Sequence, residues 1–164
     1  GLLSTLLARD ISHKVAVSVR YPHQENIASA LGLVSVQEKD VNGWAEEHQP
    51  DVIIETVGGN GSTLEQAVQI CRPSGRIVTL GVFTQTPSIN ATRLVVQEIE
   101  MIGSFIYGEG DRITDFGTTV NLLPRYREEI TKLQTHQFPL NSIEEAFHCA
   151  EDKRSLAIKV TVLP

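Results

Sequence analysis

Apolar residues along the chain follow two kinds of spacing. Leu2, Leu3, Leu6 and Leu7 recur three or four residues apart, which is typical of one face of a helix. The unbroken valine and isoleucine run at 52–54 is typical of a strand covered on both faces. Helical patterns cover 2–9, 22–31, the region around Trp44, 64–71 and 92–99, and strand patterns cover 14–19, 33–36, 51–57, 76–80 and 101–106. This alternation predicts an α/β fold with a doubly wound parallel sheet.

The pattern changes after residue 106. A helical pattern at 111–123 is followed by a charged stretch at 125–132, an extended segment at 135–140, an apolar helical stripe and an alternating strand at 157–163. The stripe consists of Ile143, Ala146, Phe147 and Ala150. We therefore expect two parts, 1–106 and 107–164, the second with α+β character. Ser62 with Glu65, and Asn141 with Glu144, have the spacing of helix N-terminal capping boxes.

The order of elements at the beginning of the chain is unusual for a doubly wound fold. Such a fold normally starts with a strand and a glycine-rich G-x-G-x-x-G turn into the first helix. Here the helical pattern follows Gly1 directly. We expect Gly1 to be the last glycine of that turn, with the first strand and most of the glycine-rich loop missing from the chain. Two neighbouring strands would then lack a partner and expose apolar edges.

Charge and composition exclude some classes of function. The net charge is −6 and there is no basic run, which argues against a nucleic-acid partner. No apolar stretch has the length of a membrane span, so no membrane partner is expected. Cys71 and Cys149 lack metal-type spacing and are predicted to be small buried residues. Two unpaired cysteines fit a cytoplasmic, reducing location.

Several segments together carry a resemblance to a known family. They are KVAVS at 14–18, DVIIETVG at 51–58, TLEQA at 63–67, RPSGRIV at 72–78, LGVF at 80–83, GSF at 103–105, THQFPL at 135–140, EEAF at 144–147 and IKV at 158–160. In this order and spacing the chain resembles the C-terminal part of a zinc-type medium-chain dehydrogenase/reductase, the family of alcohol, polyol and threonine dehydrogenases.

The resemblance implies that 1–106 is a partial Rossmann-type dinucleotide-binding domain and that 107–164 is the C-terminal portion of the catalytic domain. The parent enzyme would transfer hydride between NAD(P) and a small alcohol, ketone or polyol. Its zinc ligands would come from a region outside this chain. We therefore expect no catalytic residue and no metal ligand here, and no activity from the chain alone.

Ligands of open α/β sheets bind beyond the carboxyl ends of the strands. From this rule and the resemblance, the predicted cofactor-binding residues are Gly1, Val19, Arg20, Tyr21, Thr56, Val57, Gly58, Gly81, Val82, Phe83, Ser104 and Phe105. The first three groups would lie near the pyrophosphate, the adenosine and its ribose, and the last two near the nicotinamide. The alternative is that the glycines are plain turn formers and that 104–106 is plain core strand. His136 and Glu55 are expected to be structural; a buried Glu55 needs a hydrogen-bonding partner.

Arg20 bears on the choice between the two cofactors. An acidic residue at the end of the second strand of this fold accepts bonds from the ribose 2′-hydroxyl of NAD. Here Val19 takes that place and Arg20 follows, which would attract the 2′-phosphate of NADP. The sequence therefore favours NADP over NAD, the alternative being that Arg20 is an ordinary solvated surface residue.

Two other functions stay open from the sequence. One is a zinc-free quinone or enone reductase of the same superfamily, which the run 56–59 would suit. The other is a non-catalytic nucleotide-binding or oligomerisation fragment. The resemblance also implies that 101–106 is the edge strand of the sheet through which relatives pair, and an apolar edge strand left bare predicts a homo-oligomer.

Overall fold

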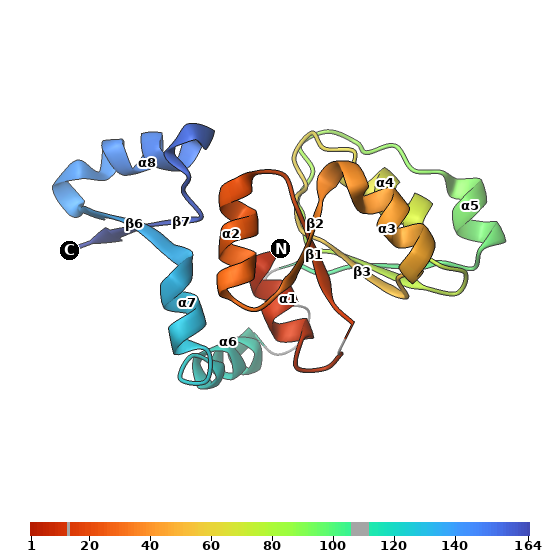
Figure 1. Cartoon of the computed structure of the whole chain (residues 1–164), viewed down its shortest axis with the longest axis horizontal. Helices are drawn as coiled ribbons and strands as arrows, with labels where there is room; N and C mark the ends of the chain where they lie inside the picture. The colour runs from red at the N-terminus through yellow and green to blue at the C-terminus, as the bar shows by residue number, and fades with distance from the viewer. Residues whose placement is uncertain (13, 106–111) are drawn as a thin grey trace.

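The computed structural model describes residues 1–12, 14–105 and 112–164, without the side chains of 112–115. Helices and strands alternate through the first part (Figure 1). The elements there are α1 (Leu2–Ala8), β1 (Ala16–Val19), α2 (Pro22–Ala30), β2 (Val34–Gln37), η1 (Glu38–Asp40), α3 (Val41–His48), β3 (Val52–Glu55), α4 (Thr63–Ile70), β4 (Arg76–Thr79), α5 (Ala91–Val96) and β5 (Glu100–Gly103). The second part contains α6 (Arg112–Leu122), α7 (Arg127–Leu133), β6 (Gln134–Pro139), η2 (Leu140–Ser142), α8 (Ile143–Glu151), η3 (Lys153–Ser155) and β7 (Lys159–Leu163).

The strands of the first part form two parallel sheets. β1 pairs with β2, and β3, β4 and β5 pair in that order. A doubly wound sheet has the strand order 3-2-1-4-5-6. The five strands fill that order except for one place, between β1 and β3, where the described residues supply no strand. The α/β fold is thus confirmed, and β1 and β3 each lack a hydrogen-bonded strand on one side, as the sequence predicts.

Each sheet has its own apolar core. Leu64, Ala67, Val68 and Cys71, the predicted stripe of α4, are all buried against Ile77 of β4. The core over the first sheet consists of Val17, Val19, Ala28, Leu31, Leu33 and Leu133. Full burial of one aliphatic side chain is worth roughly 1.5–3 kcal/mol. These two clusters therefore hold the strands, and with them the turns at their carboxyl ends.

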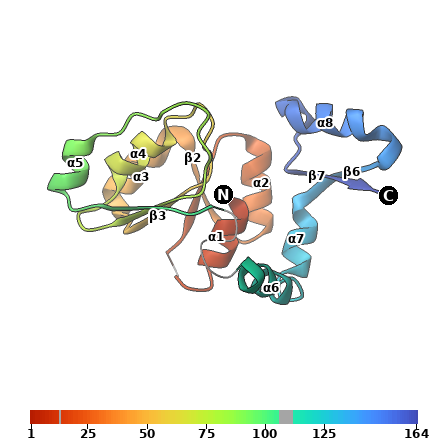
Figure 2. The same ribbon diagram turned by 180° about the vertical axis from the view of Figure 1, so that it is seen from behind.

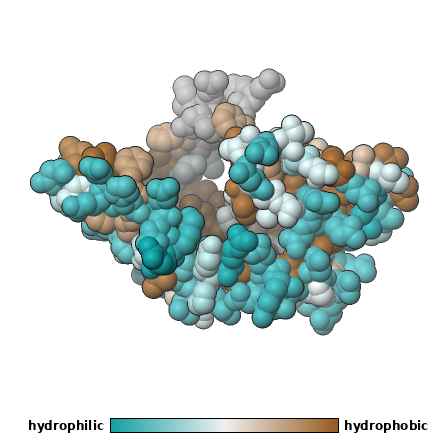
Figure 3. Space-filling view, turned by 90° about the horizontal axis from the view of Figure 1, so that it is seen from above, coloured by the Kyte–Doolittle hydropathy of each residue, from teal (hydrophilic) through white to brown (hydrophobic). Residues whose placement is uncertain are grey.

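The opposite face of the three-stranded sheet is partly exposed. Val52 is 54% exposed, and Ile54 and Ile102 are each 38% exposed. The chain's accessible surface is 11402 Å². A compact monomer of 18.1 kDa would expose about 8,000 Å². Hydrophobic patches are visible toward both ends of the molecule in Figure 3. Parallel sheets normally bury both faces, so this chain leaves apolar surface that a stable arrangement covers.

The second part lies to one side in both ribbon views (Figures 1 and 2). β6 pairs in parallel with β7, and α7 joins this pair to the first part. Lys132 Nζ donates to the Ala30 carbonyl oxygen at 3.0 Å, and an Arg9 nitrogen lies 3.5 Å from a Glu129 carboxylate oxygen. The predicted boundary between residues 106 and 107 falls outside the described residues.

Several local predictions need correction. The side chain of Ser62 makes no capping hydrogen bond, because its backbone (φ −90°, ψ 15°) lies outside the extended region that a capping residue adopts. The N-cap of α8 is Ser142 rather than Asn141, and it too lacks a side-chain cap. In the predicted apolar stripe of α8 only Ala146 is buried. Cys71 is buried as predicted, whereas Cys149 is only partly buried.

The predicted strand at 101–106 begins one residue earlier and ends at Gly103, with residue 106 outside the described part. Among the helices that the structure describes, none has both the length and the apolarity that a bilayer span requires.

Candidate functional site

The turn after β3 and the turn after β4 interlock. Gly59 N donates to the Val82 carbonyl oxygen at 2.8 Å, and Thr84 N donates to the Gly59 carbonyl oxygen at 3.2 Å. The sequence-predicted residues Thr56–Gly58 and Gly81–Phe83 are therefore brought together at the carboxyl edge of one sheet. The side chains of Val57 and Val82 remain largely exposed there, and so are available to a ligand.

Glycine is required at two positions of these turns. Gly58 has a φ of +59°, and a Cβ atom there would lie 2.5 Å from the Val82 carbonyl oxygen. A Cβ atom on Gly81 would meet Glu55 Oε2 and Gly58 N, both at 2.4 Å. A side chain does not fit at Gly58 or at Gly81, so the backbones of the two turns pack directly against each other. We call the surface formed by these two turns the cradle. Such close approach suits a ligand held by backbone groups.

Glu55, the last residue of β3, holds the turn after β3 in place through hydrogen bonds. Its side chain is almost completely buried, and Oε1 accepts hydrogen bonds from Val57 N at 2.8 Å, Gly58 N at 3.1 Å and Thr63 Oγ1 at 2.7 Å. The expectation that a buried Glu55 has a polar partner is confirmed. Its second oxygen, Oε2, is buried and accepts no hydrogen bond within the described part of the chain.

Gly1 lies beside the same edge. A Cβ atom built on it would be 3.5 Å from Thr56 Oγ1 and 3.7 Å from a methyl of Val17. The start of α1 therefore touches both sheets, and both ribbon views place the N-terminus near the middle of the molecule. Anionic groups near this helix start are favoured by its free amides.

The turn after β1 presents charged side chains, unlike the glycine turns after β3 and β4. Val19 pairs with Gln37 in the strand register, so the next residues, Arg20 and Glu38, are neighbours at the ends of β1 and β2. Arg20 Nε lies 2.8 Å from Glu38 Oε2, and both side chains are substantially exposed. Sequence reasoning missed Glu38. The sequence did contain a signal for it, because Arg20 and Glu38 bear opposite charges and each follows one of two strands that pair in parallel.

Gln24 fixes the backbone of this turn. Its Oε1 accepts from Arg20 N at 2.9 Å and from Tyr21 N at 3.2 Å. The Tyr21 ring in turn stacks on His23, with centroids 5.6 Å apart. The position from which the Arg20 side chain projects is therefore defined by α2 as well as by β1.

Ser104 and Phe105 follow β5. Ser104 N donates to the Thr79 carbonyl oxygen at 3.0 Å, which extends the β4–β5 pairing by one bond. Thr79 pairs with Gly103, so Ser104 lies next to the chain that enters the Gly81 turn. The Phe105 side chain is mostly exposed. The structure thus gathers the residues after β3, β4 and β5 at one edge, with Val19, Arg20 and Tyr21 at the corresponding edge of the other sheet.

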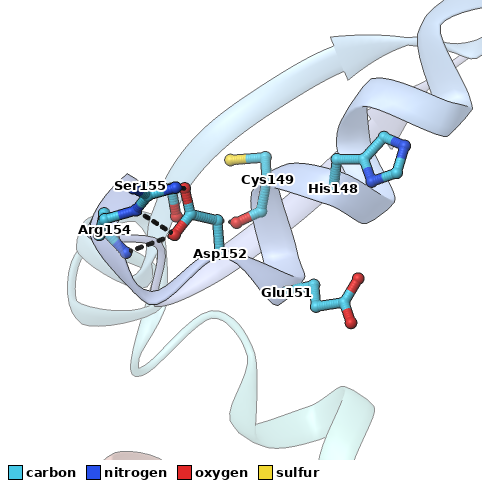
Figure 4. Close-up of a pocket in the computed structure, with 6 residues that line it drawn as sticks. All are labelled: His148, Cys149, Glu151, Asp152, Arg154 and Ser155. Carbon is cyan, nitrogen blue, oxygen red and sulfur yellow. Dashed lines mark hydrogen bonds and ion pairs between the residues drawn. The ribbon is translucent and has the colours of Figure 1, made fainter.

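No group of three or more histidine, cysteine, aspartate or glutamate side chains suited to a metal ion occurs among the residues that the structure describes. A hollow near the end of α8 is lined by His148, Cys149, Glu151, Asp152, Arg154 and Ser155 (Figure 4). Its Arg154 and Asp152 pair with each other at 3.1 Å, which lowers the pKa of Asp152. Figure 4 shows His148 and Cys149 pointing apart, so these side chains do not form a catalytic pair.

Comparison with known proteins is consistent across sequence and structure. Residues 1–124 match the profile of a family described as zinc-binding dehydrogenase. The chain is 26% identical to 2-dehydro-3-deoxy-L-galactonate 5-dehydrogenase of Pseudoalteromonas atlantica, over 90% of this chain and 43% of that protein. It is 29% identical to L-idonate 5-dehydrogenase (NAD(P)(+)) of Escherichia coli, over 83% of this chain and 39% of that protein.

The fold also matches solved structures. The crystal structure of L-idonate 5-dehydrogenase from Escherichia coli superposes with a TM-score of 0.81 at 23% identity, covering 99% of this chain and 46% of that one. The chain thus spans less than half the length of each of these relatives.

Proposed function

We propose, because the chain belongs to the zinc-binding dehydrogenase family, that it forms the cofactor-binding part of an oxidoreductase. The whole protein transfers hydride between NAD(P) and an alcohol, ketone or polyol. The names of the relatives, which are dehydrogenases of sugar acids and polyols, support this substrate class.

The observation that carries the proposal is the pair of interlocked glycine turns after β3 and β4. Their backbones meet where a Cβ atom does not fit, at the edge where ligands of α/β sheets bind. In our proposal Gly81, Val82 and Phe83 contact the nicotinamide end, and the backbone at Ser104 and Phe105 contacts its carboxamide. Thr56, Val57 and Gly58 lie against the adenosine or ribose, and Gly1 lies near the pyrophosphate.

When bound, the dinucleotide supplies or accepts the hydride, and the residues of this chain hold and orient it. We assign no catalytic residue to the chain. The described residues do not provide a zinc ligand set, so we derive no step through zinc. In the proposed domain arrangement, residues 1–106 bind the cofactor and residues 107–164 belong to the catalytic portion of the protein. Two free cysteines, Cys71 and Cys149, support the proposal of a cytoplasmic location.

We also propose that the protein forms a homo-oligomer through β5. Within the described part of the chain this strand pairs with β4 alone, and the side chains of Ile102 and Phe105 are exposed. An uncovered apolar edge strand favours association with a second copy. Replacement of Ile102 by Lys is expected to lower the molar mass measured by light scattering; an unchanged mass would contradict the proposal.

The activity is tested with the complete protein that carries this chain. Oxidation of NADH or NADPH is followed at increasing concentrations of ketoses and keto sugar acids, and the reverse reaction is followed with polyols and sugar acids. We expect turnover with at least one such substrate, and none from residues 1–164 alone. Failure of the complete protein to bind either dinucleotide would refute the proposal.

For the cofactor, we propose a preference for NADP, based on Val19 and Arg20. A guanidinium group binds a phosphate through charge-assisted hydrogen bonds. Replacement of Arg20 by Ala is expected to weaken NADPH binding by about tenfold, which corresponds to about 1.4 kcal/mol, with little effect on NADH. Tighter binding of NADH than of NADPH that persists in the variant would contradict the preference.

A further inference from the structure

We propose that Glu38 is a specificity-determining residue, which limits the preference for NADP by pairing with Arg20. This inference rests on the proposed binding of a nicotinamide dinucleotide. It adds Glu38, which directly follows β2, to a choice that the sequence assigns to the residues at the end of β1 alone.

The geometry of the two strand ends carries the inference. The register Val19 to Gln37 places the following residues, Arg20 and Glu38, side by side beyond the carboxyl ends of β1 and β2. The distance between Arg20 Nε and Glu38 Oε2 is 2.8 Å, so the carboxylate helps to position the guanidinium group. Arginine has five N–H donors, so a guanidinium group that contacts Glu38 through Nε has further donors that a phosphate can engage.

Electrostatics gives the pair opposite effects on the two cofactors. A 2′-phosphate carries between one and two negative charges near neutral pH, so Arg20 attracts it and Glu38 repels it. A 2′-hydroxyl is neutral and donates a hydrogen bond to a carboxylate, so Glu38 favours NAD. With both residues in place, the attraction of Arg20 for a phosphate is reduced but not abolished.

The pair is also open to exchange. The Arg20 side chain is 66% exposed and the Glu38 side chain 45% exposed, so water screens their contact and a phosphate reaches them without unfolding the turn. The surrounding charges are mixed: Lys39 and Asp40 follow Glu38 in η1, and Glu25 lies on α2. Glu25 accepts a hydrogen bond from Gln37 Nε2 at 2.7 Å, so it is a nearby carboxylate engaged with a different residue.

The test compares Glu38→Gln with the matched control Glu25→Gln in the complete protein. Dissociation constants for NADPH and NADH are measured by fluorescence titration at low and at physiological ionic strength. We expect Glu38→Gln to raise the ratio of NADPH to NADH affinity by about fivefold to tenfold at low salt, and less at higher salt. Glu25→Gln is expected to change the ratio by less than about twofold, because its carboxylate does not hold Arg20.

A second variant separates the two ways in which Glu38 acts. In an Arg20→Ala background, Glu38→Gln still removes the direct effects of the carboxylate on the phosphate and on the 2′-hydroxyl, but it no longer releases Arg20. Its effect on the ratio should therefore be smaller than in the presence of Arg20. An equal effect in both backgrounds would overturn the claim that Glu38 acts through Arg20.

The failure of this inference differs from the failure of the proposed function. Binding of both dinucleotides with an unchanged ratio in Glu38→Gln, or an equal rise in Glu25→Gln, overturns the role of Glu38 alone. Binding of neither dinucleotide by the unaltered protein overturns the proposed function and this inference with it. Because the ratio compares two ligands on the same sample, partial loss of folded protein does not change it.

Discussion

The turns at the carboxyl edges of the two sheets are held by different interactions. Beyond β3 and β4, a buried carboxylate and two glycines lock two turns together, with several hydrogen bonds of 2.7–3.1 Å on Glu55 Oε1. Beyond β1 and β2, one exposed ion pair joins Arg20 to Glu38. The first edge fixes backbone shape and tolerates little change. The second edge presents charges that can be exchanged with small cost to folding, as suits its proposed role in selecting between two cofactors.

The largest difference is expected when the same substitution is made at both edges. Glu55→Leu should lower the free energy of unfolding by about 4 kcal/mol, because each buried donor left unpaired costs roughly 1–3 kcal/mol. Glu38→Leu should change it by less than about 0.5 kcal/mol, since an exposed ion pair contributes little. Urea unfolding followed by circular dichroism measures both. Equal losses would remove the distinction between the edges.

The next largest effect on stability is expected from substitutions at two glycines, one near each edge. Gly81→Ala should cost about 2–3 kcal/mol, because its Cβ would overlap Glu55 Oε2 and the backbone of Gly58. Gly43, inside α3 near the other edge, has no atom within 4 Å of a built Cβ. Gly43→Ala should therefore stabilise the protein by about 0.5–1 kcal/mol. Thermal unfolding of the two variants checks the signs, and a stable Gly81→Ala variant would contradict the tight packing of the cradle.

The two cysteines report whether the core beneath the first of these edges stays closed. Burial raises the pKa of the Cys71 thiol, while Arg72 and Arg93 oppose the shift. Cys149 should therefore react first with a thiol reagent, and Cys71 only as the protein unfolds. Labelling rates of Cys71 in a Cys149→Ser variant measure this, and rates as fast as those of Cys149 would contradict it.

The same shift predicts a small dependence of stability on pH. The folded-state pKa of Cys71 lies above its unfolded value, so its contribution to stability is fully present below the ordinary thiol range near pH ~8.5. The contribution is lost as the pH rises through the folded-state pKa. Unfolding midpoints of the native protein and of Cys71→Ala should therefore converge above that range.

Periodicity predicted the parts of the fold that depend on local burial. The spacing of Leu64, Ala67, Val68 and Cys71 indicated a helix with one buried face, and all four are buried. Helix caps were not predictable in this way. Ser62 has the right residue type, but its backbone (φ −90°, ψ 15°) is not the extended one that capping needs, and residue spacing does not specify that conformation. Phe147 shows the same limit, because an apolar stripe does not specify which segment covers it.

The candidate site was predictable to a similar extent. The rule that ligands bind beyond strand ends selected the turns at Thr56–Gly58 and Gly81–Phe83, and the structure brings these two turns into contact. Their interlocking depends on the register between strands, which the sequence pattern does not encode. The pairing of Arg20 with Glu38 has the same origin, since the two residues become neighbours only when β1 and β2 align.

The central claim is that the interlocked turns after β3 and β4 hold a nicotinamide dinucleotide. A crystal structure of the complete protein with bound NADPH tests it most directly. We predict that the nicotinamide ring contacts Gly81, Val82 or Phe83, and that the 2′-phosphate lies within hydrogen-bond distance of Arg20. A dinucleotide bound elsewhere on the molecule, with both turns free of it, would contradict the account.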